Sequence, residues 1–400
     1  MSDEILIGSM LPLSGAGAPD ANEFRNGAQL AISEINAKGG VLGRKLKLVC
    51  ADSGNQNADA VLEAARWLID ERGVNAIING YNIGSQNAEY EPIADAEIIY
   101  IHANTLIQHH ETVASDRYRY FGCFMGNPAD YWYGQGFIKL LSWLRDTGQW
   151  VPSSNRLAII SGTRPYSIVI ANAMRTAATE FGWEAAFGPE IVETPRSDWR
   201  EVLDRARKSD PAVLINTHFY QHDLVHFQRQ FLENPMKCLV YLQYGGLHHS
   251  FADATGESAN GVIIGTVVGL LQDEIGMNFA NRYTAAYGIS SSPQIGCVTY
   301  GSVRHYAHSV AVAGCVGAPY ENSNKNREVA CALMDQPFRS VTGTINYHRG
   351  WQAAIPYPDF TADPSLGMPH LFFQTQRGVS KIIAPAPYNT GQFEPPSWLR

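Results

Sequence analysis

The chain has 400 residues, of which 45% are hydrophobic and 17% charged, and its formal net charge is -8. This length suits two or three domains with substantial cores, and the composition excludes a disordered or fibrous protein. The acidic balance, without clustered Lys and Arg, excludes a nucleic-acid surface. The longest apolar run, Val262 to Leu271, is interrupted by Gly and Thr and is far shorter than the roughly 20 residues that cross a bilayer, so no membrane insertion is expected.

Short apolar runs alternate with amphipathic stretches through the first third of the chain. Apolar residues at helical spacing predict helices over 24–36 and 59–71, and glycines follow both. The resulting order of strand and helix predicts a parallel sheet covered on both faces. The strands expected in this region are 5–11, 45–50, 76–79 and 98–102.

The same order returns after a break at 122–130. It predicts strands over 157–161, 212–216 and 238–243, and helices over 168–181, 198–208 and 223–233. A helical pattern over 278–334 is expected to cover one lobe, and the tail from 341 is expected to form strands and long loops.

The predicted fold class is therefore α/β, with two Rossmann-like doubly wound lobes. A chain that builds two such lobes and then returns to each must cross between them more than once, which predicts a hinge with a ligand cleft. We expect lobe 1 to comprise 1–124 and about 267–341, and lobe 2 to comprise about 125–266 and 342–400.

Ligands of open α/β sheets bind beyond the carboxyl ends of the strands, so the loops there hold the candidate site. Gly84-Ser85 is expected to open a helix whose free N–H groups would suit a carboxylate or carbonyl, the alternative being that Ser85 is an ordinary N-cap. The aromatic residues in the second half suit a small, flat or apolar ligand. The candidate ligand-binding residues are Asn82, Gly84, Ser85, Ala103, Asn104 and Thr105 in the first half, and Tyr166, His218, Phe219 and Tyr244 in the second.

The sequence lacks the common signatures of enzymes. It has no GxSxG elbow, no phosphate-binding GxxxxGK[ST] loop, no GxGxxG after the first strand and no HExxH motif. We therefore expect a binding protein that needs no cofactor. His102 and His218 lie at predicted strand ends, where ligand contact and local hydrogen bonding remain equal alternatives. Two further pairs have helical spacing but no additional metal ligands, so we expect no metal site: His222/His226 and His305/His308.

The six cysteines lie mostly in apolar surroundings and lack CxxC spacing, as is typical of unpaired core cysteines. Cys315 and Cys331 bracket a stretch rich in Gly, Pro and Asn, and a disulfide between them in an oxidising compartment is the alternative.

Several sequence elements resemble the opening of a known family. Ile5 to Gly15, Asn26 to Ala31, Ile35 to Arg44 and Asp52 to Gly54 are similar to type I periplasmic binding proteins of the leucine/isoleucine/valine, amide and urea group. The resemblance extends over essentially the whole chain. It implies a clamshell of two lobes joined by three crossovers, which delivers a small-molecule ligand to the transmembrane subunits of an ABC permease.

The resemblance also implies roles for single residues. In amino-acid binders of this family, the turns that match Gly84-Ser85 and 103–105 hold the ligand carboxylate, and an aromatic residue matching Tyr166 covers the ligand. The acidic residue that would grip an α-ammonium is replaced by Tyr244. Because a buried ammonium without a carboxylate is strongly unfavourable, we predict a ligand without a free α-amino group: a small amide, a urea-like compound or a carboxylic acid. Glu91 and Asp223 are the nearest acidic residues, but both are expected inside helices, away from the turn.

Three alternatives remain open. The first is a branched-chain amino-acid binder whose ammonium is held by carbonyls and aromatic faces. The second is a cytoplasmic ligand sensor of the same fold, similar to an amide-responsive regulator. The third is an α/β hydrolase that uses His218 or a cysteine. The N-terminus lacks a basic region and an apolar region, so the protein is expected to be either a mature periplasmic form whose signal peptide was replaced by Met1, or cytoplasmic.

Overall fold

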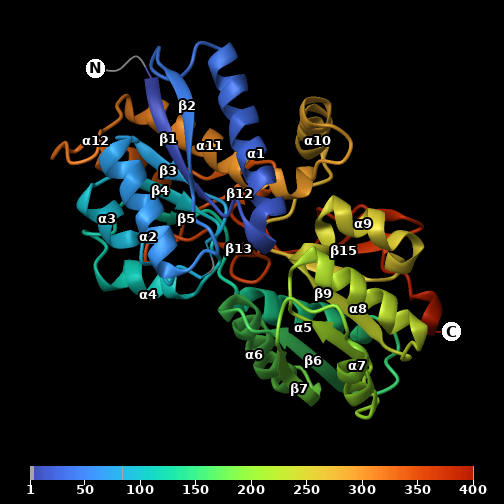
Figure 1. Ribbon diagram of the computed structural model, residues 1–400. Helices are drawn as coiled ribbons and strands as arrows, with labels where there is room; N and C mark the ends of the chain where they lie inside the picture. Colours follow the sequence, from blue (N-terminus) through green and yellow to red (C-terminus); the bar gives the residue numbers. More distant parts are fainter. Residues whose placement is uncertain (1–3, 83, 400) are drawn as a thin grey trace. The chain divides into compact units, whose positions relative to one another are not determined.

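Two sheets form the centres of two units of the chain (Figure 1). In the computed structural model, which describes residues 4–82 and 84–399, unit 1 runs up to Ala129 and includes Val268–Pro369. Unit 2 consists of Asp130–Val267 and the chain from His370 on. The chain therefore passes from one unit to the other three times, after residues 129, 267 and 369. None of the helices in the described residues is long and apolar enough to cross a membrane.

The sheet of unit 1 is entirely parallel, with the strand order β2-β1-β3-β4-β5. Its central strands are buried on both faces, which is why they are near-continuous apolar runs in the sequence. The strands of the sheet are β1 (Glu4–Leu11), β2 (Lys45–Asp52), β3 (Ala76–Ile78), β4 (Ile99–His102) and β5 (Cys123–Met125). The short strands of this unit are β11 (Phe338–Ser340), β12 (Gly343–Ile345), β13 (Pro356–Tyr357) and β14 (Met368–Pro369).

Helices pack on both faces of this sheet (Figure 1). The helix α1 lies against α11 so closely that a Cβ atom at Gly27 would be 2.0 Å from the carbonyl oxygen of Gly296, so only glycine fits there. The opposite face buries Met10 and Ile77 with Leu68 in one apolar core. The helices of unit 1 are α1 (Ala18–Ala37), α2 (Ala58–Arg66) with the π-helical turn Trp67–Glu71, α3 (Tyr90–Asp95), α4 (Gln108–Ser115), α10 (Glu274–Tyr287), α11 (Pro293–Ala313) and α12 (Lys325–Asp335).

Unit 2 repeats the parallel order and extends it. Its sheet has the order β16-β15-β10-β9-β8-β6-β7, in which β15 and β16 are antiparallel additions from the end of the chain. The strands are β6 (Arg156–Gly162), β7 (Glu184–Val192), β8 (Val213–Asn216), β9 (Leu239–Gln243), β10 (Ile263–Thr266), β15 (Leu371–Gln376) and β16 (Val379–Ala384). The helices are α5 (Tyr131–Asp146), α6 (Pro165–Glu180), α7 (Arg200–Arg207), α8 (Gln221–Glu233) and α9 (His249–Thr255).

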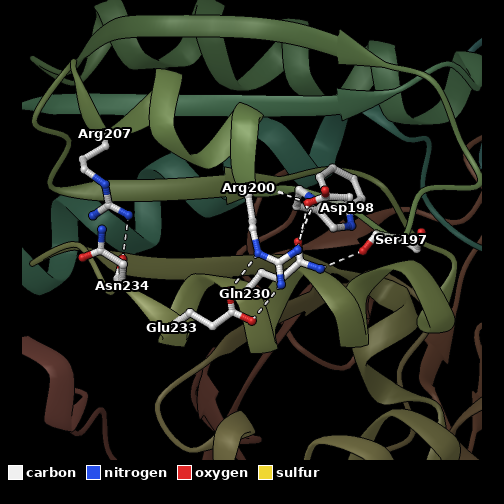
Figure 2. A network of polar contacts seen from close by, with 8 residues as sticks. Ser197, Asp198, Arg200, Arg207, Gln230, Glu233 and Asn234 are labelled. Atoms are coloured by element: carbon white, nitrogen blue, oxygen red, sulfur yellow. Dashed lines mark hydrogen bonds and ion pairs between the residues drawn. The ribbon is translucent and has the colours of Figure 1, made fainter.

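Polar contacts join α7 to α8 on the surface of unit 2 (Figure 2). Arg200 donates from Nε and Nη2 to the two carboxylate oxygens of Glu233, at 3.0 and 3.1 Å. Beneath this surface pair, Trp199 is fully buried, and its ring meets that of Phe227 edge-on at 5.3 Å. The indole N–H of Trp199 donates to the carbonyl oxygen of Asp223 at 3.1 Å. Trp199 precedes α7 as its N-cap, whereas the sequence indicated a helix that begins at 198.

The C-terminal tail is shared between the two units, whereas all of it from residue 342 was expected in the second lobe. Residues 342–369 belong to unit 1, not to the second lobe, because this segment covers the free edge of β5. The Gln352 side chain donates from Nε2 to the carbonyl oxygens of Tyr120, Phe121 and Cys123. The backbone of Met125 pairs with the carbonyl oxygen of Gln352 and with the N–H of Ala354. A pattern of apolar residues carries no signal for such edge capping.

Other expectations have clear outcomes. The helical region 278–334 consists of α10, α11 and α12 with loops between them. Cys315 and Cys331 are both free, and the Cys315 thiol donates to the carbonyl oxygen of Lys325 at 3.4 Å. The C-terminal end packs on unit 2, where the Trp398 indole N–H donates to the carbonyl oxygen of Cys238 at 2.9 Å and its ring meets Phe231.

Replacement of Trp199 and of its neighbour Arg200 is predicted to change the free energy of unfolding by very different amounts. Trp199→Ala removes a fully buried ring and is expected to lower the free energy of unfolding by about 3 to 5 kcal/mol. Arg200→Ala is expected to leave it almost unchanged, because the Arg200–Glu233 pair is exposed to solvent and screened. Urea denaturation of the three proteins measures both effects. Equal losses in the two variants would contradict this assignment of the core.

The first turn of α1 contains a buried carboxyl group whose stability contribution depends on pH. Burial raises the pKa of Asp20 from 3.8 to about 6, and the hydrogen bond from the Tyr81 hydroxyl, at 2.6 Å, lowers it only in part. The folded protein therefore holds this proton more tightly than the unfolded chain does, and the free energy of unfolding falls as the pH rises through this range.

Asp20→Asn keeps an acceptor for Tyr81 and cannot ionise. It is expected to remove that fall, which amounts to about 3 kcal/mol at neutral pH. Urea denaturation of both proteins at pH 4 and pH 7 measures the difference. An identical pH dependence in the wild type and the variant would show that Asp20 does not titrate in this way.

Candidate functional site

The carboxyl edge of the unit 1 sheet is built from buried amide side chains. The backbone N–H of Asn82, after β3, donates to Oδ1 of Asn104, after β4, at 2.8 Å. The Ser53 hydroxyl, after β2, donates to Oδ1 of Asn82, also at 2.8 Å. All three side chains are fully buried. Hydrogen bonds of these buried residues thus join the loops that follow three strands.

The loop after β4 has a constrained backbone. Thr105 adopts a positive φ of 61°, and its hydroxyl donates to the carbonyl oxygen of Asn104 at 2.6 Å. The N–H of Ala103 donates to the carbonyl oxygen of Gly80 at 2.7 Å, which ties this loop to the one after β3. The predicted residues Ala103, Asn104 and Thr105 therefore lie beside Asn82 in one rigid edge.

The expectation for Gly84 and Ser85 is wrong in one respect. These residues do not open a helix, because they lie in a series of turns and α3 begins only at Tyr90. Ser85 is not its N-cap: its hydroxyl, fully buried, accepts the N–H of Asn87 at 3.3 Å. Positive φ angles at Gln86 and Asn87 close these turns. The N-terminal dipole of a helix is therefore not available at Gly84-Ser85.

A buried carboxyl group that the sequence analysis missed lies behind Asn104. Glu89 accepts hydrogen bonds at Oε1 from the Tyr100 hydroxyl, at 2.9 Å, and from Nδ2 of Asn104, at 3.3 Å. Complete burial raises the pKa of Glu89, and these hydrogen bonds counteract the shift only in part. The amide of Asn104 is thus fixed on both sides, since its oxygen accepts from Asn82 and its nitrogen donates to Glu89.

His102 contacts other buried side chains and has no exposed surface. Its Nδ1 accepts the N–H of Asn104 at 3.2 Å, so in the neutral ring Nε2 carries the proton and donates to the Tyr90 hydroxyl at 2.6 Å. The Tyr90 hydroxyl then donates to Nδ1 of His109 at 2.6 Å, and Nε2 of His109 donates to the carbonyl oxygen of Gln352 at 3.3 Å. Burial lowers the pKa of His102 well below its usual value and that of His109 to about 3, so both rings are neutral. Local hydrogen bonding is therefore the role of His102.

The carboxyl edge of unit 2 contains a buried histidine and carboxylate. Nε2 of His218, after β8, lies 2.8 Å from Oδ2 of Asp223, and the same oxygen accepts the N–H of Arg196 at 2.8 Å. Asp223 lies in α8 as expected, and its side chain points to the loop after β8, where it contacts His218. Nε2 donates to the carboxylate, and the buried Nδ1 of the ring has no hydrogen-bond partner in the described residues. A Cβ atom at Gly162 would lie 2.6 Å from Nδ1, so the end of β6 must be glycine to accommodate the ring.

Aromatic side chains surround this histidine. Tyr166 and Phe219 meet edge-on at 5.3 Å between ring centroids, and Phe219 lies 5.8 Å from the His218 ring. The Tyr166 hydroxyl accepts a hydrogen bond from Nε2 of Gln243 at 2.9 Å. Tyr244, the next residue after β9, is buried and adopts a φ of 38°. All four residues predicted for the second half thus lie at the same edge of one sheet.

The edge of unit 1 carries amides and hydroxyls, and the edge of unit 2 carries an imidazole and aromatic rings. Groups of these kinds bind ligands through hydrogen bonds and ring contacts. In the part of the chain that the structure describes, no group of three or more His, Cys, Asp and Glu side chains could hold a metal ion. The His222 and His226 rings meet edge to face with 4.8 Å between their centroids, and the buried His305 ring stacks on Phe338 and Tyr347.

Four supporting residues escaped the sequence analysis: Asp20, Ser53, Glu89 and Gln243. Gln243 ends the predicted strand 238–243, and Ser53 lies three residues after the predicted strand 45–50, so their place near the sheet edge was a usable signal. Asp20 and Glu89 carried none, because a carboxyl group in or before a helix is ordinarily solvated.

Comparison with known proteins identifies the family. The periplasmic binding protein family model matches residues 4–356. The Leu/Ile/Val-binding protein homolog 7 of Brucella abortus is 28% identical over 263 residues, which cover 64% of this chain and only 62% of that protein. The Leu/Ile/Val-binding protein homolog 2 of the same species is 28% identical over 379 residues, which cover 94% of this chain and 91% of that protein.

Solved structures agree with this match. The crystal structure of a putative branched-chain amino acid ABC transporter from Silicibacter pomeroyi is 43% identical, covers 99% of this chain and 100% of its own, and gives a TM-score of 0.92. The substrate-binding protein LivJ from Streptococcus pneumoniae, in complex with isoleucine, is 17% identical, covers 96% and 100%, and gives a TM-score of 0.73, which shows a shared fold. The chain therefore belongs to the periplasmic binding protein family, with the two-lobed α/β fold of type I.

Proposed function

We propose that this chain is the solute-binding component of an ABC uptake transporter. It would act in the periplasm, capture a small molecule between its two lobes and deliver it to the transmembrane subunits of the permease. The family match over 4–356 and the 43% identity to a putative branched-chain amino acid ABC transporter support this proposal. The ligand would bind to one lobe first, and the other lobe would then close over it. The closed form would be populated because it binds the ligand more tightly than the open form does.

We further propose that the ligand is a small amide, a urea-like compound or a carboxylic acid without a protonated amine. The observation that carries this proposal is the engagement of Asp223. It is the first acidic residue after β8, and its Oδ2 already serves His218 and the N–H of Arg196. The resemblance to amino-acid binders of the family implies that Tyr244, in the loop after β9, stands where those proteins have the acidic residue for the ammonium. A protonated amine buried at this edge would lack a free carboxylate, which is strongly unfavourable.

The side chains present suit the proposed ligand. His218 is buried and already paired with Asp223. The Tyr166, Phe219 and Tyr244 rings would cover the faces of a flat group. A few hydrogen bonds together with aromatic burial can supply the roughly -8 kcal/mol of a micromolar complex.

Binding of leucine, isoleucine or valine is the second candidate, because the relatives in the family carry that name. It would require the ammonium to be held by backbone carbonyls and aromatic faces instead of a carboxylate.

Calorimetric titration separates these candidates. The purified chain is titrated with short amides, urea and benzoate-type acids, and with leucine, isoleucine and valine. We expect micromolar binding of a compound from the first group without turnover, and no heat from the amino acids. Tight binding of leucine alone would overturn the proposed ligand class, and conversion of an amide into products would indicate a hydrolase.

Tyr244→Glu tests the same argument from the protein's side. If Tyr244 occupies the ammonium position, the new carboxylate is expected to weaken binding of the wild-type ligand by about tenfold or more and to improve binding of leucine. Tyr244→Phe is the matched control, since it retains the ring and adds no charge. Calorimetry of the three proteins measures the shift, and unchanged affinities in Tyr244→Glu would place this residue outside the site.

A further inference from the structure

A cavity of about 680 Å³ lies within unit 1, away from the carboxyl edge of its sheet. Residues of α1, α10, α11 and β11 form its walls. These elements come from both segments of unit 1, and α1, α10 and α11 are labelled near one another in Figure 1. Its volume falls in the range of about 300 to 1,000 Å³ that is typical of sites for small molecules.

Cations dominate the charged groups that line this cavity. The lining contains one carboxylate, Glu34, and four cationic side chains: Lys38, Arg282, Arg304 and Arg339. Arg339 pairs with Asp273, which adjoins the cavity from the start of α10. Two more cations than carboxylates therefore remain here, in a chain whose formal net charge is -8. This excess would attract an anion against the overall charge of the protein.

Glu34 holds two of the guanidinium groups in place. Its Oε1 accepts from Nε of Arg282 at 2.8 Å, and its Oε2 accepts from Nη1 of Arg304 at 3.2 Å. The Tyr300 hydroxyl donates to the same Oε2 at 2.7 Å. One carboxylate thus fixes two arginines from different helices, which reduces the conformational entropy that an anion would have to remove.

Donors remain for a ligand after these contacts. Four donor groups have no hydrogen-bonding partner in the part of the chain that the structure describes: Nε and Nη2 of Arg304, Nη1 of Arg282 and the Lys38 ammonium. The Arg282 and Arg304 side chains are 47% and 39% exposed, so a solute can reach them. Guanidinium groups bind carboxylate and phosphate oxygens in pairs of parallel hydrogen bonds.

An apolar wall completes the cavity. Phe338 and Val341 line it beside Tyr300, and the Phe338 ring is held by stacking on His305 with 4.6 Å between ring centroids. Such a wall suits the carbon skeleton of an organic anion better than a fully hydrated inorganic ion.

We propose that this cavity is a second binding site, for a small organic anion that carries at least two carboxylate or phosphate groups. Arg304, Arg282 and Lys38 bind the anionic groups, and Phe338 and Val341 contact the carbon skeleton. The site is separate from the sheet edges and does not depend on which solute binds there.

The test uses citrate and pyrophosphate as probes and acetate as a singly charged comparison, in calorimetric titrations of the full chain at low ionic strength. We expect citrate or pyrophosphate to bind with a Kd below about 1 mM, which acetate does not reach. Stronger binding of citrate would indicate a polycarboxylate, and stronger binding of pyrophosphate would indicate a phosphate-bearing ligand.

Variants locate the binding. Arg304→Ala and Lys38→Ala are each expected to raise the Kd about tenfold, and Lys38→Ala serves even if loss of Arg304 affects folding, because Lys38 is exposed at the end of α1. Arg200→Ala is the matched control, since Arg200 is also an exposed arginine paired with a carboxylate, but in unit 2. No binding by the wild type, or equal Kd values in wild type, Lys38→Ala and Arg304→Ala, would overturn the proposal.

Discussion

The constraint on which the structure depends is the satisfaction of polar groups at the buried carboxyl ends of parallel strands. Each sheet is covered on both faces, so a polar side chain that ends a strand has little water and must find a partner within the protein. In unit 1 the partners are amides and hydroxyls, as between Asn82 and Asn104. In unit 2 they are His218 and Asp223. The same pairing that stabilises each fold also fixes the side chains at each candidate site.

The two units obey this constraint in the same topological place. The order β2-β1-β3-β4-β5 in unit 1 corresponds to β7-β6-β8-β9-β10 in unit 2. In both, the strand order reverses beside the first strand, where open sheets leave a crevice for ligands. Unit 1 offers amides in neutral surroundings, whereas unit 2 offers rings around one imidazole. These groups fit the proposal that the solute is uncharged or anionic. The cationic cavity among α1, α10 and α11 shows that unit 1 also presents charge elsewhere.

Much of the architecture could be predicted, because buried parallel strands and amphipathic helices leave strong periodic signals. The strands from Ile5, Lys45 and Leu157 and the helices around Phe24 and Ile168 appear where the patterns indicated. The short strand β5, by contrast, depends on Gln352 from far along the chain to cover its edge, and residues 342–369 were consequently placed in the wrong lobe. Local periodicity cannot report a contact made across more than two hundred residues.

The candidate site divides in the same way. The sequence by itself determined which loops follow the strands, and hence that Asn104, His218, Phe219 and Tyr244 lie at carboxyl edges, because strand order dictates where loops emerge. Only the tertiary structure decided which side chains partner one another: that Ser85 lies in turns and not at a helix start, that Glu89 is buried behind Asn104, and that Asp223 turns back to His218. The physical reason is that burial and hydrogen-bond partners are set by packing between elements distant in the chain, which no short window of residues encodes.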